Sequence, residues 1–396
     1  MLRVGLIFLT SSLLWAPLCR AQIVRDSAGV RIVENRAPSW TASRRWQIAV
    51  RPSVSIGVED GDEPYLLSRV YSALRLPNGQ IVIGDSESGQ LRFFDASGKF
   101  VRAAGRRGRG PGEFHEFSSL ILCLLLRNEL FVVDGGADRA HIFSTTGEYK
   151  RTIGFQHQPG SSTPGLRGCF ADGTLLMRNV PVAVLRGDPG TLIRGTTQYF
   201  RYASDGRPVA KLATFPDRTR YVNHHANVTH YPYVPFSPES HGAAGARTTY
   251  FNHSGAAELE RRDADGKLTG LVRWQVRRTR ASAVYRRYVA TELAAIPEQR
   301  RPQYAAFYAK TLPVPELVPA VGQLLVDALE HVWIKRYQLP WDAVPTYEIF
   351  DASGRWLGSI STPAHVELFQ IGEDYILGKH RDELGVERIV VHSLHR

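Results

Sequence analysis

Phe94-Asp95-Ala96-Ser97-Gly98-Lys99-Phe100 returns nearly intact as Phe350-Asp351-Ala352-Ser353-Gly354-Arg355-Trp356. In both copies an aromatic residue ends one strand, polar turn formers follow, and glycine supplies a positive φ before the next strand begins. Looser copies place their glycines at Gly147, Gly206 and Gly266, so successive glycines are 49, 59, 60 and 88 residues apart. A motif that recurs at such intervals indicates a repeat architecture.

A second kind of hairpin precedes these turns along the chain. Leu74 to Ile83 forms two short apolar runs around Asn78-Gly79, and Cys169 to Leu176 repeats the pattern around Asp172-Gly173. Two hairpins in succession make a four-stranded antiparallel meander, which is one blade of a propeller. The sequence therefore predicts an all-β fold, a six-bladed β-propeller with four-stranded blades.

We expect five blades at about 73–105, 119–154, 166–214, 244–276 and 321–361. The sixth blade would combine 366–394 with an N-terminal strand near 30–50, and the count of six depends on Asp26 to Asn35 and Val366 to Leu394 closing together. Joining the two chain ends in one blade closes the ring and leaves only short, protected edges.

The stretch from about 281 to 315 breaks the strand pattern. Apolar residues from Val284 to Leu293 recur at helical spacing, and Pro297 ends that run. This predicts a short helical insertion packed against one face of the ring. A lid over that face is the open alternative.

The N-terminus has the layout of a secretory signal. Arg3 precedes an apolar run from Val4 to Leu14 that is too short to span a membrane, and small residues precede Gln22. We expect residues 1–21 to be removed and residues 22–396 to form a single propeller domain in the periplasm or outside the cell. Lipidation of Cys19 is the weaker alternative, because Pro17 and Leu18 are poor residues before a lipidated cysteine.

The composition constrains the partners. The net charge is +11, which in the cytoplasm would suggest nucleic acid, but export argues against that partner. An anionic glycan, a lipid head group or an acidic protein fits better, unless the arginines only solvate the surface.

Two cysteines, Cys123 and Cys169, follow the leader and fall on expected strands, where apolar packing is favoured and pairing stays open. We expect a monomer.

The link between the first two blades carries a family resemblance. Gly105-Arg106-Arg107-Gly108-Arg109-Gly110-Pro111-Gly112-Glu113-Phe114, followed by Leu130 to Asp134 and Arg139 to Phe143, resembles an NHL repeat. Together with Asp26 to Asn35, Phe350 to Gly358 and Asp382 to Glu387, the chain is similar to a family of uncharacterised exported six-bladed propellers of bacteria. The resemblance implies the fold and brings no activity with it.

Two groups of residues are candidate ligand contacts. Arg106, Arg107 and Arg109 cluster guanidinium groups, which suit phosphate, sulfate and carboxylate, on a link that emerges at a ring face. The segment from Tyr221 to His241 is rich in proline and so reads as a long loop. It carries polar and aromatic side chains suited to carbohydrate or peptide contact: His224, His225, His230, Tyr231 and Tyr233.

Evidence for catalysis is weak. Glu113, His115 and Glu116 are weak candidate ligands for a cation, because one local trio on an irregular segment seldom makes a site. Nucleophile elbows, Walker motifs and dinucleotide fingerprints are absent from the sequence. The sequence therefore predicts a ligand- or protein-binding propeller without a cofactor. The alternative is a metal-dependent lactonase- or lyase-type enzyme with its site in the central channel.

Overall fold

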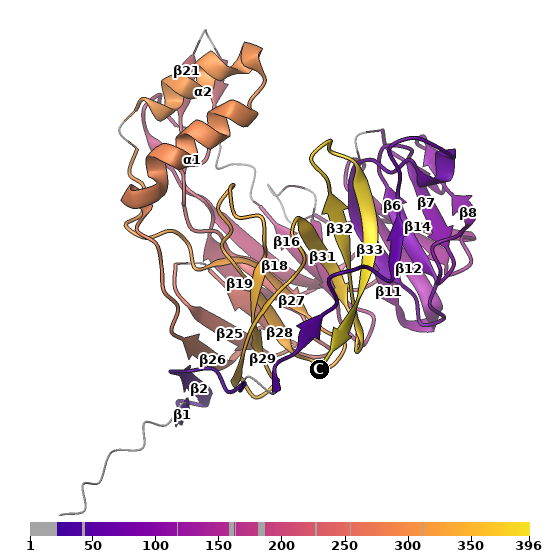
Figure 1. The fold of residues 1–396 in the computed structure, drawn as a ribbon, viewed down its shortest axis with the longest axis horizontal. Coiled ribbons are helices and arrows are strands. Elements are labelled where there is room, and N and C mark those ends of the chain that lie inside the picture. The colour runs from indigo at the N-terminus through magenta and orange to yellow at the C-terminus, as the bar shows by residue number, and fades with distance from the viewer. Residues whose placement is uncertain are drawn as a thin grey trace, which may run out of the picture.

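Six β-sheets follow one another along the chain as blades of a ring (Figure 1). Residues from all six line a central channel. The computed structural model describes residues 22–41, 44–116, 118–157, 162, 164–180, 187–225, 228–253, 255–310 and 312–396, and for His225 only the backbone. The expected leader, residues 1–21, lies outside the described residues. Among the helices of the described part, none is long and apolar enough to cross a membrane.

Each blade begins with the strand nearest the channel and proceeds outward by hairpins. The first blade is β5 (Val70–Arg75), β6 (Ile81–Asp85), β7 (Gln90–Phe94) and β8 (Phe100–Ala104). The second is β11 (Leu120–Leu125), β12 (Glu129–Asp134), β13 (Arg139–Ser144) and β14 (Tyr149–Gly154). The third is β15 (Gly165–Cys169), β16 (Leu175–Asn179), β18 (Thr196–Tyr202) and β19 (Pro208–Pro216).

The remaining three blades complete the ring. The fourth is β23 (His241–Ala244), β24 (Thr249–Asn252), β25 (Glu258–Arg262) and β26 (Leu268–Trp274). The fifth is β27 (Val321–Val326), β28 (Val332–Arg336), β29 (Thr346–Phe350) and β30 (Trp356–Ser361). The sixth contains β31 (Val366–Ile371), β32 (Tyr375–Arg381) and β33 (Glu387–His395). The predicted six-bladed propeller with four-stranded blades is confirmed.

The recurring turn works as its residues predict. The Asp95 carboxylate accepts hydrogen bonds from the backbone N–H groups of Ser97 and Lys99, at 2.9 and 3.0 Å. Asp351 makes the same pair of bonds with Ser353 and Arg355. Gly98 and Gly354 follow at φ of 89° and 88°, where a side chain would be strained. The motif therefore marks the hairpin between the third and fourth strands of a blade.

The N-terminal strands close the ring differently from the prediction. The hairpin of β1 (Gln22–Ser27) and β2 (Val30–Asn35) extends the fourth blade, with β2 parallel to β26. It is β3 (Gln47–Ile48) and β4 (Val54–Ile56) that pair with β33 and complete the sixth blade. The expected pairing of an N-terminal strand near 30–50 with the last blade therefore holds for β3, whereas the expected closure through Asp26 to Asn35 is wrong.

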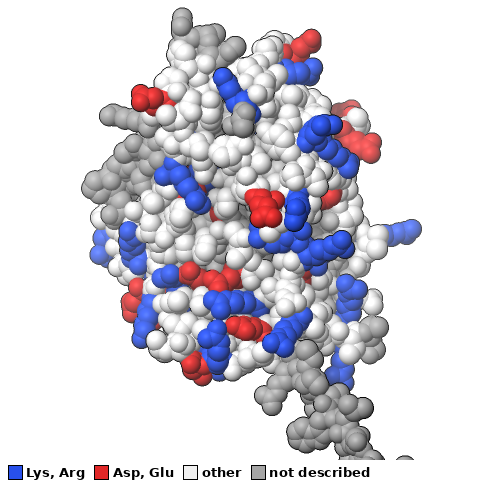
Figure 2. Space-filling model, turned by 90° about the vertical axis from the view of Figure 1, so that its left-hand side faces the viewer, with Lys and Arg blue, Asp and Glu red and all other residues white. Residues whose placement is uncertain are grey.

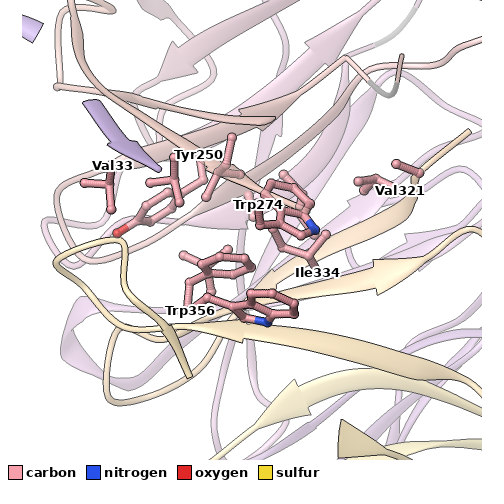
Figure 3. Close-up of a cluster of buried hydrophobic side chains, with 13 residues drawn as sticks. Val33, Tyr250, Trp274, Val321, Ile334 and Trp356 are labelled. Atoms are coloured by element: carbon pink, nitrogen blue, oxygen red, sulfur yellow. The ribbon is translucent and has the colours of Figure 1, made fainter. Parts of the chain in front are cut away.

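The reason lies in what the β2 hairpin buries. Val33 packs into the apolar cluster between the fourth and fifth blades, where Tyr250, Trp274 and Trp356 also lie (Figure 3). The Asn35 amide then donates to the Gly354 carbonyl and accepts from the Trp356 N–H, both at 3.0 Å. These contacts hold the hairpin at the junction of the fourth and fifth blades, so it is not available to the sixth.

The two cysteines also differ from the prediction. Cys123 on β11 and Cys169 on β15 form a disulfide between the inner strands of the second and third blades. Their Cα atoms are 6.3 Å apart, within the usual range for a disulfide. The preference for free, apolar cysteines is overturned, because the ring brings adjacent inner strands side by side.

The helical insertion occupies the connection from β26 to β27. It consists of α1 (Ala281–Ala295), the short 3₁₀ turn η5 (Glu298–Arg300) and α2 (Arg301–Tyr308). Figure 1 shows both helices standing out from the blades at one end of the molecule, beside β21. Tyr288 of α1 contacts Phe236, with ring centroids 4.7 Å apart, and Phe307 of α2 contacts Tyr221 at 5.9 Å. The insertion thus packs on the segment between β19 and β23.

Strand direction places three connecting segments at the same face of the ring. Connections from the outer strand of one blade to the inner strand of the next share one face, because adjacent strands are antiparallel. That face carries three segments. They are the arginine-rich link from Gly105 to Phe114, with β9 (Arg106–Arg107) and β10 (Glu113–Phe114), the helical insertion, and the histidine-rich segment from Tyr221 to His241. The histidine-rich segment contains β20 (Arg220–Tyr221), which pairs with β17 (Leu192–Ile193), and the small hairpin of β21 (Asn223–His225) and β22 (Val228–His230). The remaining short elements are the 3₁₀ turns η2 (Glu63–Tyr65) and η3 (Leu126–Asn128).

Candidate functional site

The mouth of the central channel is a cavity whose walls come mainly from the inner strands of the six blades. It has a volume of about 730 Å³, which is in the range of small-molecule sites. Each blade contributes residues at or near the start of its inner strand, among them Tyr71, Ile121, Arg167, His241, Gln323 and Glu367. The cavity therefore opens on the face that carries the three connecting segments.

Arg167, on β15, places a guanidinium group in this cavity. Its Nη1 donates to the carbonyl of Leu166 at 3.0 Å. Its side chain is exposed, and no carboxylate of a described residue lies within ion-pair distance of it. Surrounding protein and the neighbouring Arg178 lower the pKa of Arg167. Its positive charge is therefore not compensated at close range.

Lys335, at the end of β28, is a second such cation. Burial lowers the pKa of its ammonium group, and Glu367 opposes that change only in part. The Glu367 carboxylate is itself 3.5 Å from Lys379. Among the described residues no carboxylate forms an ion pair with Lys335. A cation held in protein without a counter-ion is costly, so this position favours a bound anion.

The other charges of the channel mouth are paired. Arg178 lies 3.4 Å from the Asp217 carboxylate and 3.7 Å from Glu239. Glu239 also faces Arg218, at 4.0 Å. The cavity lining therefore holds three cations, Arg167, Arg178 and Lys335, against the two carboxylates Glu239 and Glu367.

His241 is the titratable group at the centre of this arrangement. Burial holds its pKa at about 4, with Arg167 and Arg178 acting in the same direction and Glu239 against it. A hydrogen bond with the backbone of Val321 also favours the charged form but does not outweigh burial. His241 is therefore neutral at pH 7.

Acidification is expected to weaken the fold through His241. The unfolded chain binds this proton near pH 6.5 and the folded chain only near pH 4, so stability is complete above 6.5 and is lost as the pH falls toward 4. The loss amounts to at most about 3 kcal/mol. Urea midpoints at pH 7 and pH 4.5 measure it, and His241→Asn should lose less stability than the wild type. If His224→Asn, which changes an exposed histidine, reduced the loss equally, His241 would not be its source.

The arginine-rich link is more paired than its sequence indicates. Arg106 is 2.7 Å from Glu113, and Arg107 is 2.8 Å from Glu87. Arg109 makes no ion pair with a described residue and borders a hollow of about 370 Å³ together with Arg107, His115 and Glu116. The link thus remains a predicted anion contact, with Arg109 as its least compensated member.

The weak metal candidates are not brought together as a cation site. The Glu113 carboxylate is occupied by Arg106 and by the N–H of Gly110 at 2.8 Å, and these bonds lower its pKa. Across the described ranges, no group of three or more His, Cys, Asp or Glu side chains is placed to hold a metal ion. The lactonase or lyase alternative would need such ligands to converge from several inner strands.

The predicted contact residues of the histidine-rich segment do not all lie together. His224 lies exposed on β21, within 3.3 Å of Thr229, while the side chain of His225 is outside the described atoms. His230, Tyr231 and Tyr233 line a second cavity of about 350 Å³ beneath the helical insertion. The predicted contacts are therefore only partly brought together.

Arg167 and Lys335 were not predicted from the sequence. The inner strands read as apolar runs, and strand alternation alone does not tell which side chains face a channel. A signal for Arg167 exists in hindsight, since it is a lone cation inside the short strand Gly165–Cys169. Lys335 lies on β28, the second strand of its blade, so a search of the inner strands would not have found it.

The outer surface seen in Figure 2 does not offer a charged patch as an alternative to the channel mouth. Figure 2 shows one side of the molecule, on which Lys and Arg are interspersed with Asp and Glu and are not gathered into one patch. The net charge of +11 is thus partly balanced locally on that side.

Comparison with known proteins supports the fold. Residues 62–124 match the model of a family described as a 6-bladed beta-propeller. A comparison with curated protein sequences gave no match.

Three solved structures are similar across most of the chain. A member of the DUF4221 family from Bacteroides vulgatus has a TM-score of 0.50 at 8% identity, covering 89% of this chain and 99% of that one. A Bacteroides fragilis protein that is proposed to be exported has a TM-score of 0.46 at 12% identity, covering 91% and 99%. Virginiamycin B lyase from Staphylococcus aureus has a TM-score of 0.41 at 10% identity, covering 89% and 100%. The DUF4221 structure supports the shared fold, and at 8% identity it says nothing about activity.

Proposed function

We propose that this chain is a binding propeller that takes an anionic ligand at the mouth of its central channel. The observation that carries the proposal is the pair of cations Arg167 and Lys335, which line one cavity without an ion pair among the described residues. A ligand carboxylate, sulfate or phosphate would supply the missing counter-charge. Charge-assisted hydrogen bonds of this kind contribute about 1.5–3 kcal/mol each.

The surroundings suit recognition better than bond cleavage. Glu239 and Glu367 are held by arginine and lysine side chains, and His241 is set among the guanidinium groups of Arg167 and Arg178. Both carboxylates are thus engaged in ion pairs with neighbouring cations. These groups therefore fix the charge of the cavity.

Export of the protein is part of the same proposal. The signal-like residues 1–21 support it, and so does the Cys123–Cys169 disulfide, since such bonds persist in oxidising compartments. Cleavage after Ala21 would leave Gln22, the first residue of β1, at the N-terminus. Intact mass measurement on protein recovered from the native host checks this, and an uncleaved or lipidated chain would contradict it.

Citrate, a compact tricarboxylate at pH 7, is expected to bind at the channel mouth. Arg167→Met and Lys335→Met should each weaken its binding about tenfold or more, because each removes one charge-assisted contact. Isothermal titration of the mature protein measures the affinity.

Two matched variants serve as controls. Arg207→Met and Lys267→Met remove exposed cations from hairpin turns at the opposite face, and their affinity should stay within about twofold of the wild type. Equal losses in all four variants, or no citrate binding, would overturn the proposal. A stoichiometric divalent cation held by Glu239 or Glu367 would favour the lactonase or lyase alternative.

A further inference from the structure

A second cavity lies beside the channel mouth, between the histidine-rich segment and the helical insertion. Its volume is about 350 Å³. Five of its lining residues are tyrosines, which come from both walls: Tyr231, Tyr233, Tyr288, Tyr304 and Tyr308. Only Pro232 and Phe307 in the lining lack a polar side-chain atom.

The tyrosines are arranged to offer both ring surface and hydroxyl groups. Tyr231 is half-buried, and its ring makes no aromatic contact with a described residue. Tyr288 and Tyr308 are also half-buried, and burial raises their pKa, that of Tyr308 to about 12, so both hydroxyls stay protonated and can donate. Amphipathic rings of this kind contact a ligand with one apolar and one polar side.

The other polar side chains of the lining include both hydrogen-bond donors and hydrogen-bond acceptors. Asn223 and Gln303 carry amides, Glu292 accepts, and His230 can do either according to its tautomer. A ligand rich in hydroxyl groups, each both donor and acceptor, matches this set. A lipid chain does not, because it would need a mostly apolar groove.

Arg218 joins this cavity to the channel mouth. It lines the tyrosine cavity, and its Nη1 lies 4.0 Å from Glu239, which lines the channel mouth. Its guanidinium is 3.9 Å from the ring centre of Tyr233, and Arg220 packs against the same ring at 4.1 Å. Arg220 makes no ion pair with a described residue, so the bridge between the cavities is positively charged.

We propose that the channel mouth and the tyrosine cavity together bind an acidic polysaccharide. One sugar ring lies among the tyrosines, and a carboxylate farther along the same polysaccharide chain reaches Arg167 or Lys335. The proposal rests on the anionic site at the channel mouth and adds the class of ligand. Pyranose rings account for the tyrosines and amides, and uronic acid carboxylates account for the unpaired cations.

Titration of the mature protein with three probes tests the ligand class. The probes are a hexamer of galacturonic acid, the same hexamer fully methyl-esterified, and hexaglutamate. The acidic sugar should bind best, and esterification should weaken it about tenfold or more because the charge is lost. Hexaglutamate, which has the charge without the rings, should also bind at least about tenfold more weakly.

Variants of Tyr231 test the second cavity. Tyr231→Ala should weaken the acidic sugar about tenfold and leave citrate binding unchanged, while Tyr231→Phe should keep the affinity within about threefold. Citrate binding that depends on Arg167 and Lys335, combined with no effect of Tyr231→Ala, would overturn the polysaccharide proposal alone. Citrate binding that is unchanged in both Arg167→Met and Lys335→Met would overturn the proposed anionic site itself. Stronger binding to hexaglutamate, or to phosphatidylglycerol vesicles, would replace the polysaccharide by an acidic protein or a lipid surface.

Discussion

Replacing Asp327 by alanine is expected to lower the free energy of unfolding by about 3–5 kcal/mol. The Asp327 side chain is fully buried and accepts hydrogen bonds from Trp333 Nε1 at 3.0 Å and from Arg396 Nη2 at 2.8 Å. Together with the bonds from His331, these contacts hold its pKa at about 2 against the opposing effect of burial. The substitution would leave a guanidinium and an indole N–H without their acceptor.

The effect is large because Arg396 joins three parts of the ring. Its guanidinium also donates to the carbonyls of Gly372 and Glu373, at 2.9 and 2.8 Å, and lies 4.2 Å from the ring centre of Trp46. Asp327 belongs to the fifth blade, the two carbonyls to the sixth, and Trp46 to the N-terminal segment that closes it. Arg396 thus fastens the fifth blade to the sixth and to the N-terminal segment that completes it.

Denaturant unfolding of the wild type and Asp327→Ala measures this loss. Asp351→Ala is the matched control, because Asp351 caps a half-buried turn with the same backbone bonds and no buried ion pair. It should cost about 1 kcal/mol. Equal costs in the two variants would show that the ion pair with Arg396 does not hold the ring.

Loss of the Cys123–Cys169 disulfide is expected to cost about 4 kcal/mol. The two residues are 46 positions apart, and closing a loop of that length removes conformational entropy from the unfolded chain. Because the bond joins neighbouring inner strands, its loss should also loosen the contact between the second and third blades.

Thermal unfolding of the wild type with and without reductant, compared with the Cys123→Ser/Cys169→Ser double variant, measures the effect. The variant should melt at the same lowered temperature with or without reductant. Free thiols on the folded wild-type protein, detected by alkylation, would contradict the disulfide, and so would a melting temperature that reductant leaves unchanged.

Most of the fold could be predicted from local turn chemistry. The Asp-x-x-Gly turns, such as those at Asp95 and Asp351, place a hairpin wherever they occur, and their spacing sets the number of blades. The position of the N-terminal hairpin could not be predicted in this way. The pairing of β2 with β26 joins residues far apart in sequence, and the apolar Ile32 and Val33 would fit the edge of any blade.

The candidate site was harder to predict than the fold. Arg167 and Lys335 line the same cavity only because six blades close around it. The sequence next to each residue does not indicate that it faces the channel. The tyrosine cavity likewise needs two segments, around Tyr231 and Tyr304, that the sequence separates by a complete blade. The aromatic character of each segment could be recognised, but not their meeting.

The central claim is that the channel mouth holds an anion between uncompensated cations. Locating bromide by anomalous diffraction, in crystals soaked in sodium bromide, tests it most directly. We expect a bromide peak in the channel mouth within contact distance of Arg167 or Lys335, and its loss in the Arg167→Met/Lys335→Met variant. Bromide bound only at outer surface arginines, with the channel mouth empty, would contradict it.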